Sequence, residues 1–399
     1  MIQTVVSNAS APEYGQATIS FPIREEDYPS VVNMLQRMGL GDPLERDCRV
    51  DEVCGNWPIL KRLEKVAINL DEMDYLAKRL DSFDAQEKAK FQAAAVRFGL
   101  FDMRHLIDLT FCCQETTVIT DFSDLEKVGR RHYLDVNGSS APSEELENVD
   151  GYETALLLIG DGDGTITPYG VIYDNGMQLR PVYDGQNFPL YQHQDAVLVL
   201  GLTHESDLDM NSATTWLFLP ASAERLERAL KRGGFEPGSS IHCTCVGGNI
   251  QEELEARLDF ERESLKSLNT FASAIASIDE AQHAKFKAVI QMANPQSAAE
   301  MAALAQNLDL FDFVPGVHSP KEYGEFMIRE SGHFDLDDDL APFIDYEAYG
   351  QKEINAEGGI FNEQGYVTYK GTQSLSELMR PLAEQKHAGS EMRMGGFSR

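Results

Sequence analysis

Residues 70–93 read LDEMDYLAKRLDSFDAQEKAKFQA and residues 265–288 read LKSLNTFASAIASIDEAQHAKFKA, so an offset of 195 aligns the two stretches without gaps. Eight of the 24 aligned positions are identical, and the same offset places Gly129 on Gly324. Self-similarity at a long, fixed period indicates one structural unit that is used twice. The identical residues of the first stretch are Leu70, Ala77, Ser82, Asp84, Ala89, Lys90, Phe91 and Ala93.

The two units follow the same plan. Each opens with two runs of β-branched and aromatic residues, which predict a small antiparallel sheet: IQTVVSN and ATISFP in the first unit, AVLVLGL and TTWLFLP in the second. Each continues with a helix that ends at a glycine (Gly39 or Gly233), then a short strand with cysteines at 46–54 or 241–246. Apolar residues at helical spacing follow, with Ser82 and Ser277 as the expected N-caps.

These patterns predict an α+β fold, an elongated multi-domain chain of small antiparallel sheets and helical segments. The first unit is expected at 1–135, β-rich over 1–60 and helical over 61–135. A polar linker with a hairpin-rich insert is expected at 136–200. The second unit is expected at 201–370, with a β-rich part at 196–250, a helical part at 251–335 and an acidic subdomain at 336–370. A flexible tail is expected at 371–399.

Residues 160–167, GDGDGTIT, resemble the middle of an EF-hand calcium loop. Asp161 and Asp163 would be ligands 3 and 5, but Ile159 and Gly170 then stand where ligands 1 and 12 are needed. The apolar runs on both sides predict strands, so we expect a hairpin turn that binds no calcium and tolerates Asp163→Asn.

No catalytic, cofactor or metal site is predicted. The sequence has no G-x-S-x-G, P-loop or H-E-x-x-H motif. Cys243 and Cys245 lie beside His242, but no C-x-x-C pair completes a zinc site. Cys48 and Cys243 take matching positions in the two units, which suggests a buried strand position. We expect no enzyme and no cofactor.

Acidity is the strongest compositional feature. The 399 residues hold 65 Asp and Glu against 34 Lys and Arg, a formal net charge of −31. Nucleic acids and anionic membranes repel such a chain. No run of apolar residues is long enough to span a bilayer, and six cysteines are few for a secreted protein, so we expect a cytoplasmic location.

The acid residues gather in patches that could imitate DNA. Glu252, Glu255, Asp259 and Glu263 recur at helical spacing and predict an acidic helix face, although a merely solvated surface remains an alternative. Carboxylates one helical turn apart are separated by about 5–6 Å, close to the phosphate spacing along a DNA strand. The other expected members of this surface are Glu322, Glu325, Asp335, Asp337, Asp338, Asp339, Asp345 and Glu347.

Residues 340–369, LAPFIDYEAYGQKEINAEGGIFNEQGYVTY, closely resemble the end of the ArdA antirestriction proteins. Roughly 196–370 resembles one complete ArdA chain, and 1–135 resembles the N-terminal and central parts of that family more weakly. The resemblance carries over to a motif of eight residues: Phe343, Ile344, Asp345, Tyr346, Glu347, Ala348, Tyr349 and Gly350. It implies that the three aromatic residues pack in the domain core or a dimer contact, while Asp345 and Glu347 present charge.

The resemblance implies a function. ArdA proteins are acidic mimics of bent B-form DNA, made on mobile elements, that occupy the DNA-binding groove of Type I restriction–modification enzymes. They are not catalysts, and they dimerise through their C-terminal region. This sequence departs from them by its second unit and its insert at 151–200, so a homodimer and an intrachain pseudo-dimer both stay open.

The expected partner is therefore a DNA-binding host defence enzyme, a Type I methyltransferase and specificity complex, with no direct binding to nucleic acid or membrane. One alternative is an acidic partner-binding or scaffold protein of a mobile genetic element without DNA mimicry. Another is an enzyme with a cleft in 151–200, near Asp161, Asp163, Tyr169 and Asp184.

Overall fold

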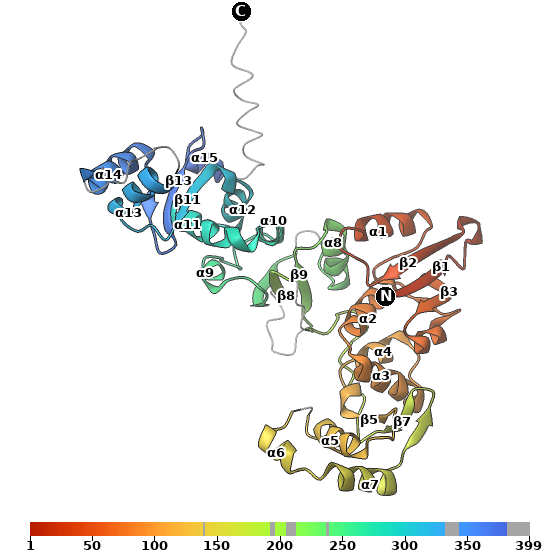
Figure 1. Cartoon of the computed structure of the whole chain (residues 1–399). Coiled ribbons are helices and arrows are strands. Elements are labelled where there is room, and N and C mark those ends of the chain that lie inside the picture. Colours follow the sequence, from red (N-terminus) through yellow and green to blue (C-terminus); the bar gives the residue numbers. More distant parts are fainter. Residues whose placement is uncertain (139, 192–195, 205–212, 237–238, 332–342, 381–399) are drawn as a thin grey trace, which may run out of the picture. The chain divides into compact units, whose positions relative to one another are not determined.

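The computed structural model describes residues 1–138, 140–191, 196–204, 213–236, 239–331 and 343–380. It contains helices and small antiparallel sheets, which confirms the α+β class (Figure 1). The chain forms two compact units, one of Met1–Gln192, Leu202–Leu217 and Ser222–His242, the other of His193–Gly201, Phe218–Ala221 and Cys243–Arg399. Within the described ranges, no helix combines the length and the apolar character that a membrane span requires.

The first unit begins with a four-stranded sheet of order β2-β1-β3-β4, in which each pair is antiparallel. Side chains of β1 and β2 alternate between buried and more exposed positions, as expected of strands with one face on a core. Helix α1 (Tyr28–Arg37) ends just before Gly39, whose φ of 65° suits glycine. The other elements are β1 (Ile2–Ser7), η1 (Pro12–Tyr14), β2 (Gln16–Phe21), β3 (Cys48–Gly55), η2 (Pro58–Leu63) and β4 (Ala67–Ile68).

Three helices follow, and their N-termini are capped by polar side chains. Asn69 caps α2 (Leu70–Asp81), Asp84 caps α3 (Ala85–Phe98) and Asp102 caps α4 (Met103–Leu109). The prediction of Ser82 as an N-cap is wrong, because Ser82 is the C-cap of α2. Asp84 forms a capping box with Glu87 instead. The Asp84 side chain accepts a hydrogen bond from the Glu87 N–H, and the Glu87 side chain accepts one from the Asp84 N–H.

The segment from 113 to 173 builds a second small sheet with helices on it. Strand β7 pairs with both β5 and β6, in the order β5-β7-β6. The prediction of strands and hairpins from residue 151 is therefore wrong for 151–161, which form helix α7, while β6 and β7 form the hairpin. The elements are η3 (Cys113–Glu115), β5 (Thr117–Ile119), α5 (Leu125–Val136), α6 (Ser143–Asn148), α7 (Gly151–Asp161), β6 (Thr165–Thr167) and β7 (Gly170–Tyr173).

Helix α7 forms because its start is capped and one side packs closely on α5. The Asp150 carboxylate accepts a hydrogen bond from the Glu153 N–H, which fixes the first turn. A Cβ on Gly129 of α5 would clash with the carbonyl oxygen of Gly151, so the two backbones touch. GDGDGTIT thus begins in the last turns of a helix rather than between two strands. The predicted linker at 136–150 also contains α6.

A further sheet has the order β10-β8-β9, formed by β8 (Leu198–His204), β9 (Thr215–Leu219) and β10 (Ile241–Gly247). Helix α8 (Ala223–Arg232) ends at Gly233, as predicted, and belongs to the first compact unit. Cys48 on β3 and Cys243 on β10 are both buried, as their matching positions predicted.

The second unit is mainly helical and has a small sheet of order β11-β13-β12. Ser277 is the C-cap of α10, so its prediction as an N-cap is wrong, like that of Ser82. The elements are α9 (Glu252–Glu255), α10 (Leu265–Ala276), η4 (Glu280–Gln282), α11 (His283–Ala293), α12 (Ala298–Gln306), η5 (Leu308–Leu310), β11 (Phe311–Pro315), α13 (Pro320–Glu325), η6 (Phe326–Glu330), α14 (Tyr346–Glu357), β12 (Ile360–Phe361), β13 (Gly365–Tyr369) and α15 (Leu375–Leu378).

Helices α13 and α14 cross at two glycines. A Cβ on Gly324 would clash with the carbonyl oxygen of Tyr346, and one on Gly350 would clash with the carbonyl oxygen of Pro320. Both glycines are buried. Because the obstacle is backbone on each side, no side-chain rotation can make room for a larger residue.

We predict that Gly350→Ala destabilises the second unit by about 3 kcal/mol or more, since the backbones of α13 and α14 must separate. Thermal or urea unfolding measures the effect. Gly160→Ala is the matched control, because a Cβ there meets nothing within 4 Å. The control should be neutral or stabilising by up to about 1 kcal/mol. If Gly350→Ala and the control have equal free energies of unfolding, the two helices do not touch as described.

Candidate functional surfaces

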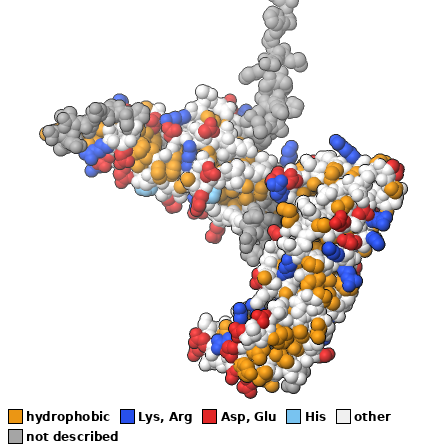
Figure 2. Space-filling model, turned by 45° about the vertical axis from the view of Figure 1, so that its right-hand side comes forward, with side chains coloured by type: hydrophobic (Ala, Val, Ile, Leu, Met, Phe, Trp, Pro, Cys, Tyr) orange, Lys and Arg blue, Asp and Glu red, His pale blue; other side chains and the backbone are white. Residues whose placement is uncertain are grey.

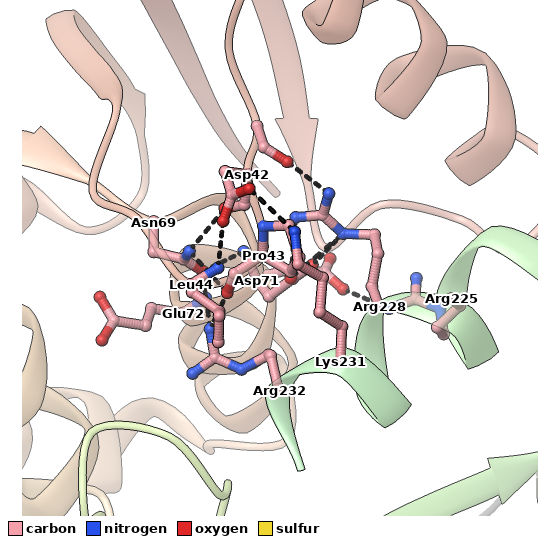
Figure 3. A network of polar contacts seen from close by, with 12 residues as sticks. Asp42, Pro43, Leu44, Asn69, Asp71, Glu72, Arg225, Arg228, Lys231 and Arg232 are labelled. Carbon is pink, nitrogen blue, oxygen red and sulfur yellow. Dashed lines mark hydrogen bonds and ion pairs between the residues drawn. The ribbon is translucent and has the colours of Figure 1, made fainter. Parts of the chain in front are cut away.

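Helix α8 turns three arginines toward one side. Arg225, Arg228 and Arg232 are spaced three and four residues apart, so they share a helix face. The Ser222 side chain caps the helix start, and α8 packs beside α1 within the first unit. Figure 3 shows Arg228 pointing toward Asp71 of α2, and Arg232 toward Asn69 and the loop at 42–44.

The pair of Arg228 and Asp71 lies at the centre of this network. The Arg228 Nη2 is 2.8 Å and its Nε 3.1 Å from Oδ2 of Asp71, and the two side chains are only 8% and 9% exposed. Arg228 also donates to the carbonyl oxygen of Gly41, and the Tyr28 hydroxyl donates to Oδ1 of Asp71 at 2.6 Å. Two donors from one guanidinium hold the carboxylate in a fixed orientation.

Arg225 pairs with the second carboxylate of α2. Its Nη1 lies 2.9 Å from Oδ2 of Asp74, and its guanidinium stacks 3.7 Å from the ring centre of Tyr28. Asp74 also accepts from the Ile23 N–H at 2.7 Å and pairs with Lys78 at 3.1 Å. Burial alone would raise the pKa of Asp74, but the charges of Lys78 and Arg225 and the Ile23 hydrogen bond outweigh it and hold that pKa below its ordinary value.

Arg232 completes the network at the end of α8. It donates to the Pro43 carbonyl oxygen at 2.6 Å, to Asn69 Oδ1 at 3.2 Å and to the Tyr183 hydroxyl at 2.5 Å. The Tyr183 hydroxyl in turn donates to Oε1 of Glu72 at 3.0 Å. Because all three guanidinium groups are hydrogen-bonded inside the unit, the network holds α8 against α2 and the loop at 42–44.

A cleft of about 320 Å³ opens between α1 and α8. Its charged lining is mixed: Asp42, Asp47, Glu224, Glu227, Arg228 and Lys231. Lys231 pairs with Asp42 at 3.0 Å across it. In the part of the chain that the structure describes, no group of three His, Cys, Asp or Glu side chains is placed to hold a metal ion.

The predicted acidic helix face at 252–263 is wrong, because α9 ends at Glu255 and turns follow it. Leu254 and Leu258 are both buried in this segment. Glu263 accepts a hydrogen bond from the Ala298 N–H at 2.6 Å at the start of α12. Burial raises its pKa. Glu263 therefore stabilises a helix end and is not part of a continuous row.

The other predicted members of the acidic surface differ in exposure. Glu252, Asp259, Glu322, Asp345 and Glu347 are exposed, whereas Glu255, Glu263 and Glu325 are half-buried. Asp335, Asp337, Asp338 and Asp339 lie outside the described residues. Figure 2 shows acidic side chains spread over both units among basic and hydrophobic ones.

The eight-residue motif forms the start of α14. Asp345 is its N-cap and accepts from the Ala348 N–H at 3.0 Å, while Gly350 makes the close crossing with α13. Tyr346 and Tyr349 are half-buried, and the Arg329 Nε donates to the Tyr346 hydroxyl at 3.1 Å. Phe343 is 85% exposed, so it is not a core residue of this unit. The motif therefore specifies a capped helix and its packing.

Residues 211–368 match the family model described as Antirestriction protein (ArdA). No curated protein matches the chain. The ArdA match includes α8 and runs through the motif on α14 to β13.

The ArdA-matched residues are strongly acidic, but so are residues 1–210. Residues 211–368 hold 26 Asp and Glu against 12 Lys and Arg, a net of 26 − 12 = 14 negative charges. Residues 1–210 hold 36 against 17, a net of 36 − 17 = 19 negative charges. Acidity is thus a property of both halves.

Sequence reasoning missed the arginine network, although the sequence holds a signal for it. Three arginines on one helix face are conspicuous in a chain with so few basic residues. Their partners could not be predicted, because Arg228 and Asp71 are 157 residues apart.

We predict that Arg228→Ala lowers the free energy of unfolding by about 3–5 kcal/mol, because Asp71 stays buried without its partner. Urea unfolding measures it. The control is Arg130→Ala, which breaks an exposed pair with Glu126 and should cost less than about 1 kcal/mol. Equal effects of the two substitutions would contradict the burial of the Arg228 pair.

The pKa of Asp74 predicts how stability depends on pH. A carboxylate whose pKa is lowered by folding stabilises the fold above its unfolded pKa, about 3.9, and this contribution is lost as the pH falls through the folded value. Asp74→Asn should therefore cost stability at pH 7 and progressively less below about pH 4. Unfolding curves at several pH values measure this difference. For Asp163→Asn, an exposed control, the difference from the natural chain should stay small at every pH. A gap between Asp74→Asn and the natural chain that does not shrink in acid would contradict the assignment.

Proposed function

We propose that the chain is an antirestriction protein that mimics B-form DNA with acidic side chains and occupies the DNA-binding groove of a Type I restriction–modification enzyme. The observation that carries the proposal is the ArdA match over 211–368. On this proposal the protein acts by occupying a groove, so it is not an enzyme and needs no cofactor. Its partner is the methyltransferase and specificity complex of the target enzyme.

The distribution of charge supports this proposal. The exposed carboxylates of Glu252, Asp259, Glu322 and Glu347 lie within the ArdA match. Several of the chain's few cations pair with buried carboxylates, as Arg228 does with Asp71 and Lys90 with Asp135 at 2.5 Å. Each such pair removes one positive and one negative charge from the surface. The ratio of acidic to basic side chains is therefore higher at the surface than in the whole composition. A groove lined with Lys and Arg for phosphates would attract it.

We also propose that the ArdA-like fold occurs twice in the chain. The sheets β5-β7-β6 and β11-β13-β12 have the same strand order, and their registers differ by a constant 195 residues. Val118 pairs with Ile172 in the first, and Phe313 with Val367 in the second. Thr165 pairs with Ile172, and Ile360 with Val367. This is the offset that aligns 70–93 with 265–288.

The helices on these sheets support the same proposal. Gly129 approaches the Gly151 carbonyl, and Gly324 approaches the Tyr346 carbonyl, again 195 residues apart. Asp150 and Asp345 cap α7 and α14 through the same kind of bond. On this proposal α7 is the counterpart of α14, so 151–173 would be the end of the first of the two repeats expected from the sequence and not an insert. The remaining domain boundaries expected from the sequence stay proposals.

We predict that neutralising four exposed carboxylates weakens inhibition of a Type I enzyme. The variant carries Glu252→Gln, Asp259→Asn, Glu322→Gln and Glu347→Gln. Its inhibition constant should rise roughly tenfold, since each exposed charge contributes a few tenths of a kcal/mol. DNA cleavage by the purified enzyme at increasing inhibitor concentrations measures it.

The matched control exchanges Glu and Asp at the same four positions, which keeps every charge. It should inhibit like the unaltered chain. If the neutral and the charge-conserving variants inhibit equally, the carboxylates do not mimic phosphates. The alternative of an acidic scaffold protein of a mobile genetic element would then be favoured.

A further inference from the structure

The cleft between α1 and α8 combines an apolar wall with charged groups. Its volume is about 320 Å³, and it lies within the first compact unit. Val32 of α1 and Leu40 and Pro43 of the following loop line it, and all three are buried. Glu224 and Glu227 line it from α8. A concave site that joins apolar surface to a few polar groups is the usual form of a ligand pocket.

The cations of this lining are already paired, whereas most of its carboxylates are not. Arg228 lies 2.8 Å from Asp71, and Lys231 lies 3.0 Å from Asp42 (Figure 3). The two glutamates on α8 form no ion pair with another described residue. Asp47 accepts a hydrogen bond from the Asp42 N–H at 2.9 Å, but it too pairs with no described cation. Three carboxylates therefore line the cleft without a positive partner.

The lining discriminates between classes of ligand. Four carboxylates against two cations disfavour an anion. None of the described lining residues is aromatic, so a flat ring has no partner on which to stack. An alkyl chain that ends in a cation fits both parts of the cleft. Its methylene groups cover the apolar wall while its charged end meets the carboxylates.

The side chain of Lys231 shows this chemistry within the chain itself. It is an alkyl ammonium group that lines the cleft and pairs with the Asp42 carboxylate. Both side chains are about half exposed, at 53% and 40%, so this pair leaves the cleft open to solvent. The carboxylates on α8 and at Asp47 offer a second cation the same kind of partner.

We propose that the cleft between α1 and α8 binds the cationic end of an alkyl chain, an ammonium or guanidinium group held by Glu224, Glu227 and Asp47. Two sources share this chemistry: a free alkyl amine or guanidine, and the lysine or arginine side chain of another protein. The proposal does not rest on DNA mimicry, because the cleft can hold a cation without any restriction enzyme. Its failure would leave the proposed function untouched.

The test is isothermal titration calorimetry of the full chain with two probes. One is agmatine, an alkyl chain with a guanidinium at one end and an ammonium at the other, and the other is a blocked peptide with a single arginine. Physiological salt is used, because it screens diffuse attraction to an acidic chain over distances beyond about 8 Å. The natural chain should bind at least one probe at a ratio of one to one.

The double variant Glu224→Gln, Glu227→Gln should weaken this binding about tenfold, since it removes two charged partners of the cation. The matched control is Glu144→Gln, Glu147→Gln. It makes the same charge change at the same spacing on α6, where both glutamates are exposed, and it should bind like the natural chain. Gln36→Arg brings a guanidinium into the cleft from α1 and should abolish binding.

The two probes distinguish the sources. Binding of agmatine alone assigns the cleft to a free amine or guanidine, and binding of the peptide assigns it to a protein side chain. If circular dichroism shows that the double variant is misfolded, Gln36→Arg decides alone, because Gln36 is exposed on α1 and arginine suits a helix. The proposal is overturned if neither probe saturates, if the α6 control loses as much affinity as the α8 variant, or if Gln36→Arg binds normally.

Discussion

The buried carboxylates of α2 are the constraint on which the first unit depends. Asp71, Glu72 and Asp74 are 8%, 2% and 2% exposed, and a carboxylate away from water is costly unless it is paired and hydrogen-bonded. Arg225 and Arg228 pair with Asp74 and Asp71, and Arg232 reaches Glu72 through the hydroxyl of Tyr183. These arginines lie on α8, within the ArdA-matched residues. The first unit is therefore complete only when a helix from much later in the chain is in place.

The same constraint bears on the surface. A chain with 34 basic residues engages several of them internally, while most of its 65 acidic residues have to face solvent. The acidic surface and the stable interior thus have one physical origin: a buried carboxylate needs a paired cation more than an exposed carboxylate does. The proposed mimicry uses the acidic side chains that remain exposed.

Much of the fold could be predicted from local patterns. The strands at 2–7, 16–21 and 215–219 alternate or are β-branched, and Gly39 and Gly233 end helices as expected. The apolar run at 155–159 was ambiguous, because a short buried strand and a helix packed through glycine give similar sequences. The acidic run at 252–263 kept helical spacing, but buried Leu254 and Leu258 and the hydrogen bond of Glu263 determined its path. The arginine network depends on contacts between distant segments, which no local pattern encodes.

The central claim is that the chain competes with DNA for one basic groove. The most direct measurement is the affinity of the chain for the DNA-binding part of a Type I enzyme at several salt concentrations, with and without a duplex that carries the enzyme's recognition sequence. The account predicts a linear and steep fall of the logarithm of affinity with the logarithm of salt, and complete displacement by the duplex. An affinity that does not change with salt, or a complex in which the enzyme holds the chain and the duplex together, would contradict it.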